Sequence, residues 1–228
     1  MQTVQPDRLI LWVSESALVD LPAEATMLRR WGLDIRGVRD LGPYTKLIWS
    51  LRAFPDAFLV TADDDAYYGP NWLESLVAEH VESQPCVLCR RAHRLKLRPD
   101  GGIAPYASWE WDVQDSASRV PSNDLFPTGV GGVLYPPGSL HPEVHNEEAF
   151  QSLCRTNDDI WFYWMARLAG SSARKVGSRF PAISWPGSQR GGLAGSNIST
   201  HNDAYIRALI EHYGMPEAVR QAAVAASG

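Results

Sequence analysis

The sequence has few cysteines and no long apolar run. Its three cysteines, Cys86, Cys89 and Cys154, form an odd set without framework spacing, which argues against a disulfide-stapled secreted domain and favours reduced thiols. The CxxC at 86–89 lies in a strand-like run, where positions i and i+3 point to opposite faces, so we expect no zinc site there. No stretch reaches the ~18 apolar residues of a membrane span, and the start lacks the apolar core of a signal peptide. We therefore expect a cytoplasmic protein without a transmembrane segment.

Positive charge is also scarce. The net charge is −5, and the one basic stretch, residues 89–98, is too short to indicate a nucleic-acid partner. The 228 residues and the 45% apolar share are those of an ordinary globular chain. We expect a single domain over residues 1–215 and a frayed, alanine-rich tail over 216–228. Nine tryptophans are many, and they indicate either core packing or rings that line a ligand pocket.

Strand and helix patterns alternate along the chain. Apolar runs predict strands, and helical spacing with capping residues predicts helices. The expected strands are 7–15, 33–40, 57–62, 86–97 and the centre of 126–140, and the expected helices are 22–32, 42–54, 70–82, 156–170 and 201–214. This alternation predicts an α/β protein with a mixed, mainly parallel sheet flanked by helices.

The stretch "FLVTADDDAYYGPNWLESL" places three aspartates at the end of a predicted buried strand. Ligands of α/β proteins collect beyond the carboxyl ends of such strands. In an extended segment Asp63 and Asp65 point to one side and Asp64 to the other. Two carboxylates this close to each other repel unless a cation neutralises them, and carboxylate oxygens are suitable ligands for Mg²⁺ or Mn²⁺. A simple acidic turn is the plainer alternative, because Asp is common in turns.

The strand that ends in D-x-D resembles those of GT-A fold glycosyltransferases, which use nucleotide-sugar donors. Three further blocks sharpen the resemblance: "DLGPYTKL" (40–47), "FPTGVGGVLYPPGSLHPEV" (126–144) and "DDIWFYWMARLAG" (158–170). Together they look like a bacterial group related to family 2, associated with capsule and lipopolysaccharide synthesis. The resemblance implies a GT-A-like, Rossmann-like fold. In that group a β-α unit precedes the segment "QTVQPDRLILW", which here begins directly after Met1. We therefore expect this unit to be absent. Either the start is truncated, or another chain supplies the unit, or the domain is degenerate.

The resemblance also implies roles for the acidic and basic residues. Asp65 would ligate the metal, Asp63 would contact the metal or the donor ribose, and Asp64 would help at either place. Lys46 would meet the donor phosphates, with a solvated helix lysine as the plainer alternative.

Asp159 matches the carboxylate that serves as base for the acceptor hydroxyl, with Asp158 as the second choice. The alternative for Asp159 is helix capping, since Thr156 and Asp159 have nearly the spacing of a capping box.

Other residues are candidates for binding. Gly129, Gly131 and Gly132 would let the backbone approach the donor, or would form a β-bulge. Trp109 and Trp111 flank Glu110 and would share one face of a strand, where they stack on an acceptor sugar or pack in the core. His201 follows the Gly-rich stretch 190–198 and would join the metal in a closing loop.

We therefore expect a metal-dependent, inverting glycosyltransferase that uses Mn²⁺ or Mg²⁺. It would move a sugar from a nucleotide-sugar donor to a glycan or glycolipid acceptor, as a peripheral protein at the inner face of the membrane. The alternatives are an idle domain that binds a glycan or partner, and a nucleotidyltransferase. Without the first unit, the sheet edge at 7–14 would be bare and would favour self-association.

Overall fold

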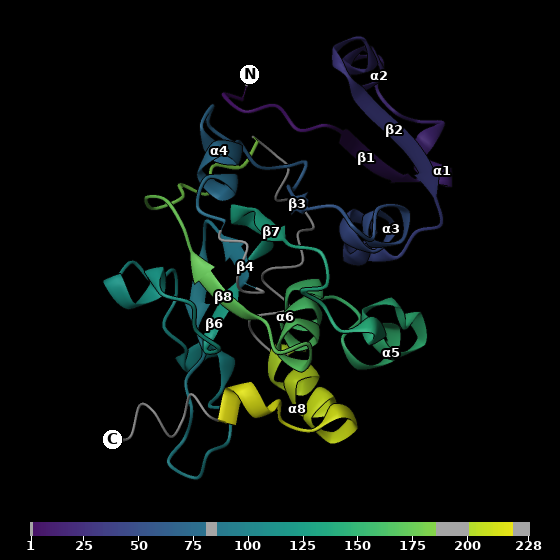
Figure 1. Cartoon of the computed structure of the whole chain (residues 1–228). Coiled ribbons are helices and arrows are strands. Elements are labelled where there is room, and N and C mark those ends of the chain that lie inside the picture. The colour runs from purple at the N-terminus through teal and green to yellow at the C-terminus, as the bar shows by residue number, and fades with distance from the viewer. Residues whose placement is uncertain (1, 81–85, 186–200, 221–228) are drawn as a thin grey trace.

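The computed structural model describes residues 2–80, 86–185 and 201–220 and is a mixed α/β protein (Figure 1). The strands are β1 (Leu9–Ser14), β2 (Leu33–Val38), β3 (Leu59–Thr61), β4 (Cys86–Cys89), β5 (Ala92–Arg94), β6 (Leu125–Pro127), β7 (Val133–Tyr135) and β8 (Ser172–Lys175).

The α-helices are α1 (Glu15–Leu18), α2 (Ala23–Met27), α3 (Thr45–Ala53), α4 (Trp72–Val77), α5 (Glu147–Leu153), α6 (Asp158–Leu168) and α8 (Asn202–Tyr213). Short 3₁₀ turns are formed by Leu28–Trp31, Gly42–Tyr44, Tyr106–Ser108, Ser116–Arg119, Gly129–Gly131 and Pro142–His145.

The central sheet has four strands in the order β3-β7-β4-β8. β4 and β8 pair in parallel, whereas β7 lies between β3 and β4 and runs antiparallel to both. β3, β4 and β8 therefore share one direction, and their carboxyl ends meet at one edge of the sheet. The sheet is mixed, as predicted, but it is not mainly parallel, because β7 enters between β3 and β4 and runs antiparallel to both. The chain reverses within residues 95–124, so that residues 125–135 run back along 86–94, and the glycine-rich turn interrupts this antiparallel run between β6 and β7.

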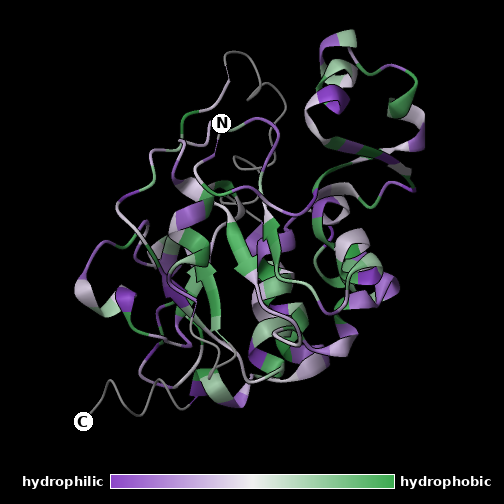
Figure 2. Ribbon diagram, turned by 45° about the horizontal axis from the view of Figure 1, so that its top comes forward, coloured by the Kyte–Doolittle hydropathy of each residue, from purple (hydrophilic) through white to green (hydrophobic). Residues whose placement is uncertain are grey.

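Helices cover both faces of this sheet. Val87 and Cys89 of β4 point into the main core with α6, and Leu88 points into a second core with Leu73 and Leu76 of α4. This alternation is the period of two of a strand that is buried on both faces. Hydrophobic strands, coloured green, stand out at the centre of Figure 2, in keeping with the apolar sequences of β4 and β7, whereas β8 contains Arg174 and Lys175. Cys86 and Cys89 lie in different cores, as their spacing predicted, and all three cysteines are buried thiols.

The N-terminal lobe, residues 9–38, stands apart from this body (Figure 1). β1 and β2 pair in parallel with each other, and in the described residues neither pairs with the four-stranded sheet. Ile35 is the one buried residue of the lobe. α3 joins the lobe to the body: Trp12 donates a hydrogen bond to Ser50 Oγ (2.7 Å), and the Arg36 guanidinium lies over the Phe54 ring.

Several predicted boundaries differ from the structure. α4 ends at Val77, shorter than the expected helix 70–82, and the expected strand 86–97 is broken at Arg90 and Arg91 into β4 and β5. In the expected tail, residues 217–220 form a helical turn whose Val219 is fully buried in the main core. An apolar contact therefore anchors the first part of a segment expected to fray.

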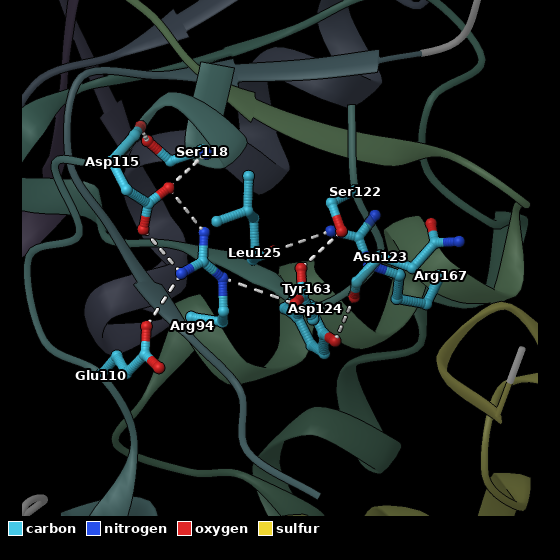
Figure 3. Close-up of polar contacts among 10 residues, drawn as sticks. All are labelled: Arg94, Glu110, Asp115, Ser118, Ser122, Asn123, Asp124, Leu125, Tyr163 and Arg167. Atoms are coloured by element: carbon cyan, nitrogen blue, oxygen red, sulfur yellow. Dashed lines mark hydrogen bonds and ion pairs between the residues drawn. The ribbon is translucent and has the colours of Figure 1, made fainter. Parts of the chain in front are cut away.

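A network of polar groups fixes the irregular segment 110–125 to the body (Figure 3). Arg94 forms ion pairs with Glu110, Asp115 and Asp124. From α6, Arg167 and Tyr163 donate hydrogen bonds to main-chain carbonyl oxygens of this segment at 2.7–3.0 Å. The buried guanidinium of Arg167 thus satisfies backbone acceptors that lack a strand partner.

In the described part of the chain, no helix is long and apolar enough to cross a membrane.

Candidate functional site

Charged side chains from three distant segments meet in a carboxylate cluster, which we define as Lys46, Asp63, Asp158 and Asp159. Lys46 on α3 places its Nζ 2.9 Å from Asp63 Oδ1, just beyond β3, and 3.2 Å from Asp158 Oδ2 at the start of α6. The side chain of Lys46 is 27% exposed, so the cluster is reachable from solvent. The plainer reading of Lys46 as a solvated helix lysine is thus wrong.

Asp159 faces the glycine-rich turn and does not cap its own helix. Both of its carboxylate oxygens accept a hydrogen bond from the Gly129 N–H, at 3.0 and 3.1 Å. The cap of α6 is Asn157, whose side chain accepts from the Ile160 N–H, while Thr156 bonds the Tyr205 hydroxyl. The predicted Thr156 cap is therefore wrong, and capping does not account for Asp159.

Gly129 lies in close contact with the cluster. A side chain there would begin 3.0 Å from both Lys46 Nζ and Asp159 Oδ1, so any larger residue would press into the cluster. The same point shows that the ammonium group and the Asp159 carboxylate lie on one side of the turn.

Burial and mutual repulsion set the protonation of the cluster. Burial, and then the neighbouring Asp158 carboxylate, raise the pKa of Asp159 to about 7. Burial also raises the pKa of Asp158, against the pull of Lys46. Burial alone would lower the pKa of Lys46, but the surrounding carboxylates raise it well above its usual value. The cluster thus combines a fixed cation with a carboxylate that exchanges its proton near neutral pH.

The three consecutive aspartates do not continue the strand. β3 ends at Thr61, and Asp64 and Asp65 lie in a turn, so the predicted strand alternation does not apply to them. Asp64 is exposed, and Asp65 is half-buried with its carbonyl oxygen accepting from the Trp185 N–H at 3.0 Å. Residues 183–185 therefore run beside this turn.

A divalent ion fits this turn by donor chemistry. Mg²⁺ is commonly bound through one or two carboxylates, with substrate phosphates and water completing the shell. Asp65 with Asp63 or Asp64 would provide that number of hard oxygen donors, although one oxygen of Asp63 already binds Lys46. No larger group, with three or more His, Cys, Asp or Glu side chains arranged for a metal, occurs in the described residues.

The described contacts of His201 do not include the aspartates. It precedes α8, is exposed, and its ring lies 5.9 Å from that of Tyr205. The glycine-rich stretch expected to close over the donor falls almost wholly in 186–200, outside the described residues.

Protein side chains fill the space beside Gly131 and Gly132. A side chain on Gly131 would begin 2.7 Å from Arg91 Cβ, and one on Gly132 would begin 2.3 Å from the Trp72 ring. Gly132 also has a positive φ of 86°. The expected approach of ligand to these two glycines is therefore replaced by internal packing, and Gly129 is the glycine that faces the cluster.

Two residues of this region were not predicted from the sequence. The Tyr68 hydroxyl accepts from the Asp63 N–H (2.9 Å) and donates to the Val130 carbonyl oxygen (3.1 Å), so it ties the aspartate turn to the glycine turn. Trp72 Nε1 donates to the Gly131 carbonyl oxygen at 2.8 Å. The "AYYGPNW" sequence after the aspartates was the available signal.

The two acceptor candidates have different surroundings. Trp109 is buried in the main core, where Nε1 donates to the Ala104 carbonyl oxygen, so it has no open face for a sugar. Trp111 is 40% exposed, and its ring lies 4.8 Å from that of His93. Only Trp111 therefore stays a candidate for stacking.

No protein-family model matches this chain, and no curated protein matches it.

Proposed function

We propose that this protein is a GT-A-like glycosyltransferase that moves a sugar from a nucleotide-sugar donor to a glycan or glycolipid acceptor. The observation that carries the proposal is the carboxylate cluster. Lys46, Asp63 and the Asp158–Asp159 pair lie far apart in the sequence, and the resemblance gave them complementary roles. Their meeting at the carboxyl end of β3 is where α/β proteins bind substrates.

Asp159 is suited to act as the base of an inverting transfer. A carboxylate with a pKa of about 7 is a stronger base than an ordinary aspartate, and a large fraction of it is unprotonated at neutral pH. It can therefore accept the proton of an acceptor hydroxyl. The acceptor oxygen then forms a bond to the anomeric carbon of the sugar. The bond from that carbon to the diphosphate breaks, and the diphosphate leaves with the electron pair.

Lys46 and a divalent ion would divide the charge of the donor between them. The ammonium group of Lys46 offers a point charge for a phosphate oxygen. Mn²⁺ or Mg²⁺, held by Asp65 with Asp63 or Asp64, would act as a Lewis acid that offsets the charge developing on the diphosphate.

The metal role is tested by thermal stability. A nucleoside diphosphate with Mn²⁺ at 100 times its Kd should stabilise the fold by about 2.7 kcal/mol, on the order of 5 °C in Tm. Asp65→Ala should abolish this rise, whereas Asp56→Ala, on the exposed turn before β3, should keep it. An unchanged rise in Asp65→Ala contradicts the metal role.

The base is tested by transfer of a radiolabelled sugar. Asp159→Asn keeps the shape of the side chain and should lower turnover by ~10²-fold or more while donor binding survives. Asp158→Asn serves as the matched variant on the same helix. Loss of activity in Asp158→Asn alone would move the role to that carboxylate, and full activity in both would place the base elsewhere.

An idle, ligand-binding domain is the second candidate. It is favoured by one observation: Lys46 already forms ion pairs with Asp63 and Asp158 within the protein, so these charges have a partner without a substrate. If the parent protein binds a nucleoside diphosphate or a glycan but transfers nothing from common nucleotide sugars, this second function is the better description.

A further inference from the structure

A second group of charges lies across the glycine turn from the carboxylate cluster. Five cationic side chains gather beyond the carboxyl ends of β4 and β8, where Cys89 pairs with Lys175 in parallel register. We call them the cationic cluster, and its members are Arg90, Arg91, Arg119, Lys175 and Arg179.

The cationic cluster surrounds Asp112 and Gly177. Arg91 and Arg179 place guanidinium nitrogens 3.9 and 3.0 Å from the Asp112 carboxylate. Lys175 reaches the same carboxylate through Gln114, which accepts from Lys175 Nζ at 3.0 Å and donates to Asp112 Oδ1 at 2.9 Å.

The other two arginines meet at Gly177. Arg119 donates to the carbonyl oxygen of Gly177, and the guanidinium of Arg90 lies against its α-carbon. Gly177 has a positive φ of 65°, and a side chain there would overlap Arg90. The backbone is thus shaped to admit two guanidinium groups at one residue.

Negative charge is in short supply here. Within the described residues, Asp112 is the one carboxylate that forms an ion pair with any member of the cationic cluster. Arg94, by contrast, has three carboxylate partners of its own (Figure 3). Two members are also buried: Lys175 is 1% exposed and Arg90 is 9% exposed.

Arg90 has an unsatisfied donor. Its Nε is buried and has no hydrogen-bond partner in the described structure. A buried cationic donor without a partner is costly, and such groups are normally paired with an anion or water. Burial and the nearby Arg119 lower the pKa of Arg90, and burial lowers that of Lys175, which is the direction expected where cations crowd without enough counter-charge.

A pocket opens at this place. Its volume is about 460 Å³, and Arg91, Arg179 and Asp112 line it together with the apolar stretch 180–182. This volume is in the range of small-molecule sites, and a mixed wall with a few polar groups is typical of them.

Hydrogen bonds connect Arg91, which lines the pocket, to the carboxylate cluster. Arg91 NH1 donates to Thr128 Oγ1 at 2.9 Å, and the next residue, Gly129, donates its N–H to Asp159. Neighbouring residues of one turn thus position the cationic pocket on one side and the base candidate on the other.

We infer that the cationic cluster binds an oxyanion, a phosphate or carboxylate group carried by a substrate that also reaches the carboxylate cluster. Guanidinium groups suit this role because their paired N–H donors match the oxygens of such groups. The anion has two sources, the diphosphate of a donor and an acidic group of a sugar acceptor. The inference concerns binding and stands whether or not sugar transfer occurs.

The test is titration calorimetry of the whole chain with inorganic pyrophosphate and D-glucuronate, and with D-glucose as the neutral probe. We expect both anions to bind, D-glucose not to bind, and affinity to fall with added salt. Arg179→Gln, which changes an exposed side chain, and Arg91→Gln should each raise the Kd for the anions at least tenfold. Arg98→Gln, also exposed but paired with Asp100 away from the pocket, should leave it unchanged.

A second readout reports the buried donor. In ¹H–¹⁵N spectra of the arginine side chains, the Nε–H of Arg90 should shift when the anion binds. Tighter binding of pyrophosphate assigns the site to a donor, and tighter binding of D-glucuronate assigns it to an acidic acceptor. No binding of either anion, or affinities that Arg91→Gln and Arg179→Gln leave unchanged, would overturn the inference.

Discussion

The N-terminal lobe and helix α6 differ most in how much they bury. In α6, nine of 11 residues are buried, including charged Asp158 and Arg167. In the lobe, α1 and α2 bury no residue, and Trp31 is 80% exposed. The helices already differ in sequence, because α6 has an unbroken apolar run over residues 160–166 and α1 and α2 do not. β1 is also an apolar run, yet none of its residues is buried, so pattern alone does not set burial.

The difference follows from the number of partners that each region has. α6 packs against the central sheet on one side and against α8 and the 3₁₀ turn 142–145 on others. The lobe has a two-stranded sheet and contacts the body through α3. A two-stranded sheet without a covering layer is only marginally stable, whereas strands that are buried on both faces form part of a hydrophobic core. The proposed site lies where packing is tight enough to raise the pKa of a carboxylate.

The largest expected effect is a matched pair of tryptophan replacements. Trp161→Ala removes a fully buried ring of α6 and should lower the free energy of unfolding by about 3–5 kcal/mol. Trp31→Ala removes an exposed ring of the lobe and should change it by less than about 0.5 kcal/mol. Urea denaturation measures both. Similar losses would break the contrast between lobe and body.

The pH dependence should be next in size. The pKa of Asp159 is about 7 in the folded state, above the ordinary aspartate value, so the folded state holds a proton that the unfolded chain has lost. Stability attributable to Asp159 therefore falls as pH rises from about 4 to 7. As pH rises through this window, the free energy of unfolding of Asp159→Asn should increase relative to that of the parent by on the order of 1–3 kcal/mol.

The lobe provides a control of opposite sign. Its hydrogen bond with Arg36 lowers the pKa of exposed Asp34, so that carboxylate stabilises the fold above its unfolded pKa. Asp34→Asn should lose a little stability at neutral pH. Equal pH profiles for the parent and Asp159→Asn would mean that the site is more hydrated than the structure has it.

Removing a helix cap should lower the free energy of unfolding more in α6 than in the lobe, but by a smaller amount than the tryptophan replacements. Asn157 caps α6 and also donates to Asn202 at 2.9 Å, so Asn157→Ala should cost about 1–2 kcal/mol. Ser14 caps the exposed, four-residue α1, and Ser14→Ala should cost about 0.5 kcal/mol or less. Thermal denaturation monitored by circular dichroism compares them, and a larger loss from Ser14→Ala would contradict the contrast.

The smallest expected effect is association through the lobe. β1 has β2 on one edge, and Leu9 and Trp31 are exposed apolar side chains of this region. We expect a second copy of the chain to pair there at high concentration, because open edges recruit strands. Leu9→Lys should weaken the dimer about five- to tenfold in sedimentation equilibrium, and Val120→Lys, exposed on the body, should not. A protein that stays monomeric at high concentration would disprove this prediction.

Local signals in the sequence predicted most of the elements. Gly32 ends its helical segment in the left-handed region, with φ 92°, as its place after residues 22–31 indicated. The buried strands before Asp63 and at Cys86 were predicted because continuous apolar runs have few other solutions. The candidate residues Lys46, Asp63, Asp158 and Asp159 were also named from the sequence, on a resemblance to a family.

Pairing and proximity could not be predicted in this way. The direction of β7 depends on the reversal within residues 95–124, which brings residues 125–135 back along 86–94. The partner of Asp159 depends on where the turn at 129–132 lies. The cationic cluster has no motif at all, because its members come from the ends of β4 and β8 and from a 3₁₀ turn. Arg90 and Arg91 looked like a solvated strand face in the sequence.

The sequence by itself determined the element types, the buried strands and the acidic strand end, because backbone propensity and hydrophobic period act over a few residues. Only the tertiary structure decided that Lys46 pairs with Asp63 and Asp158, that Gly129 faces Asp159, and that five cations gather where Asp112 is the one carboxylate, among the described residues, that forms an ion pair with any of them. Such contacts join residues more than a hundred positions apart, as Lys46 and Asp158 are, and their energies depend on burial. Burial is a property of the packed chain, since desolvation acts on a charge only when distant segments remove its water.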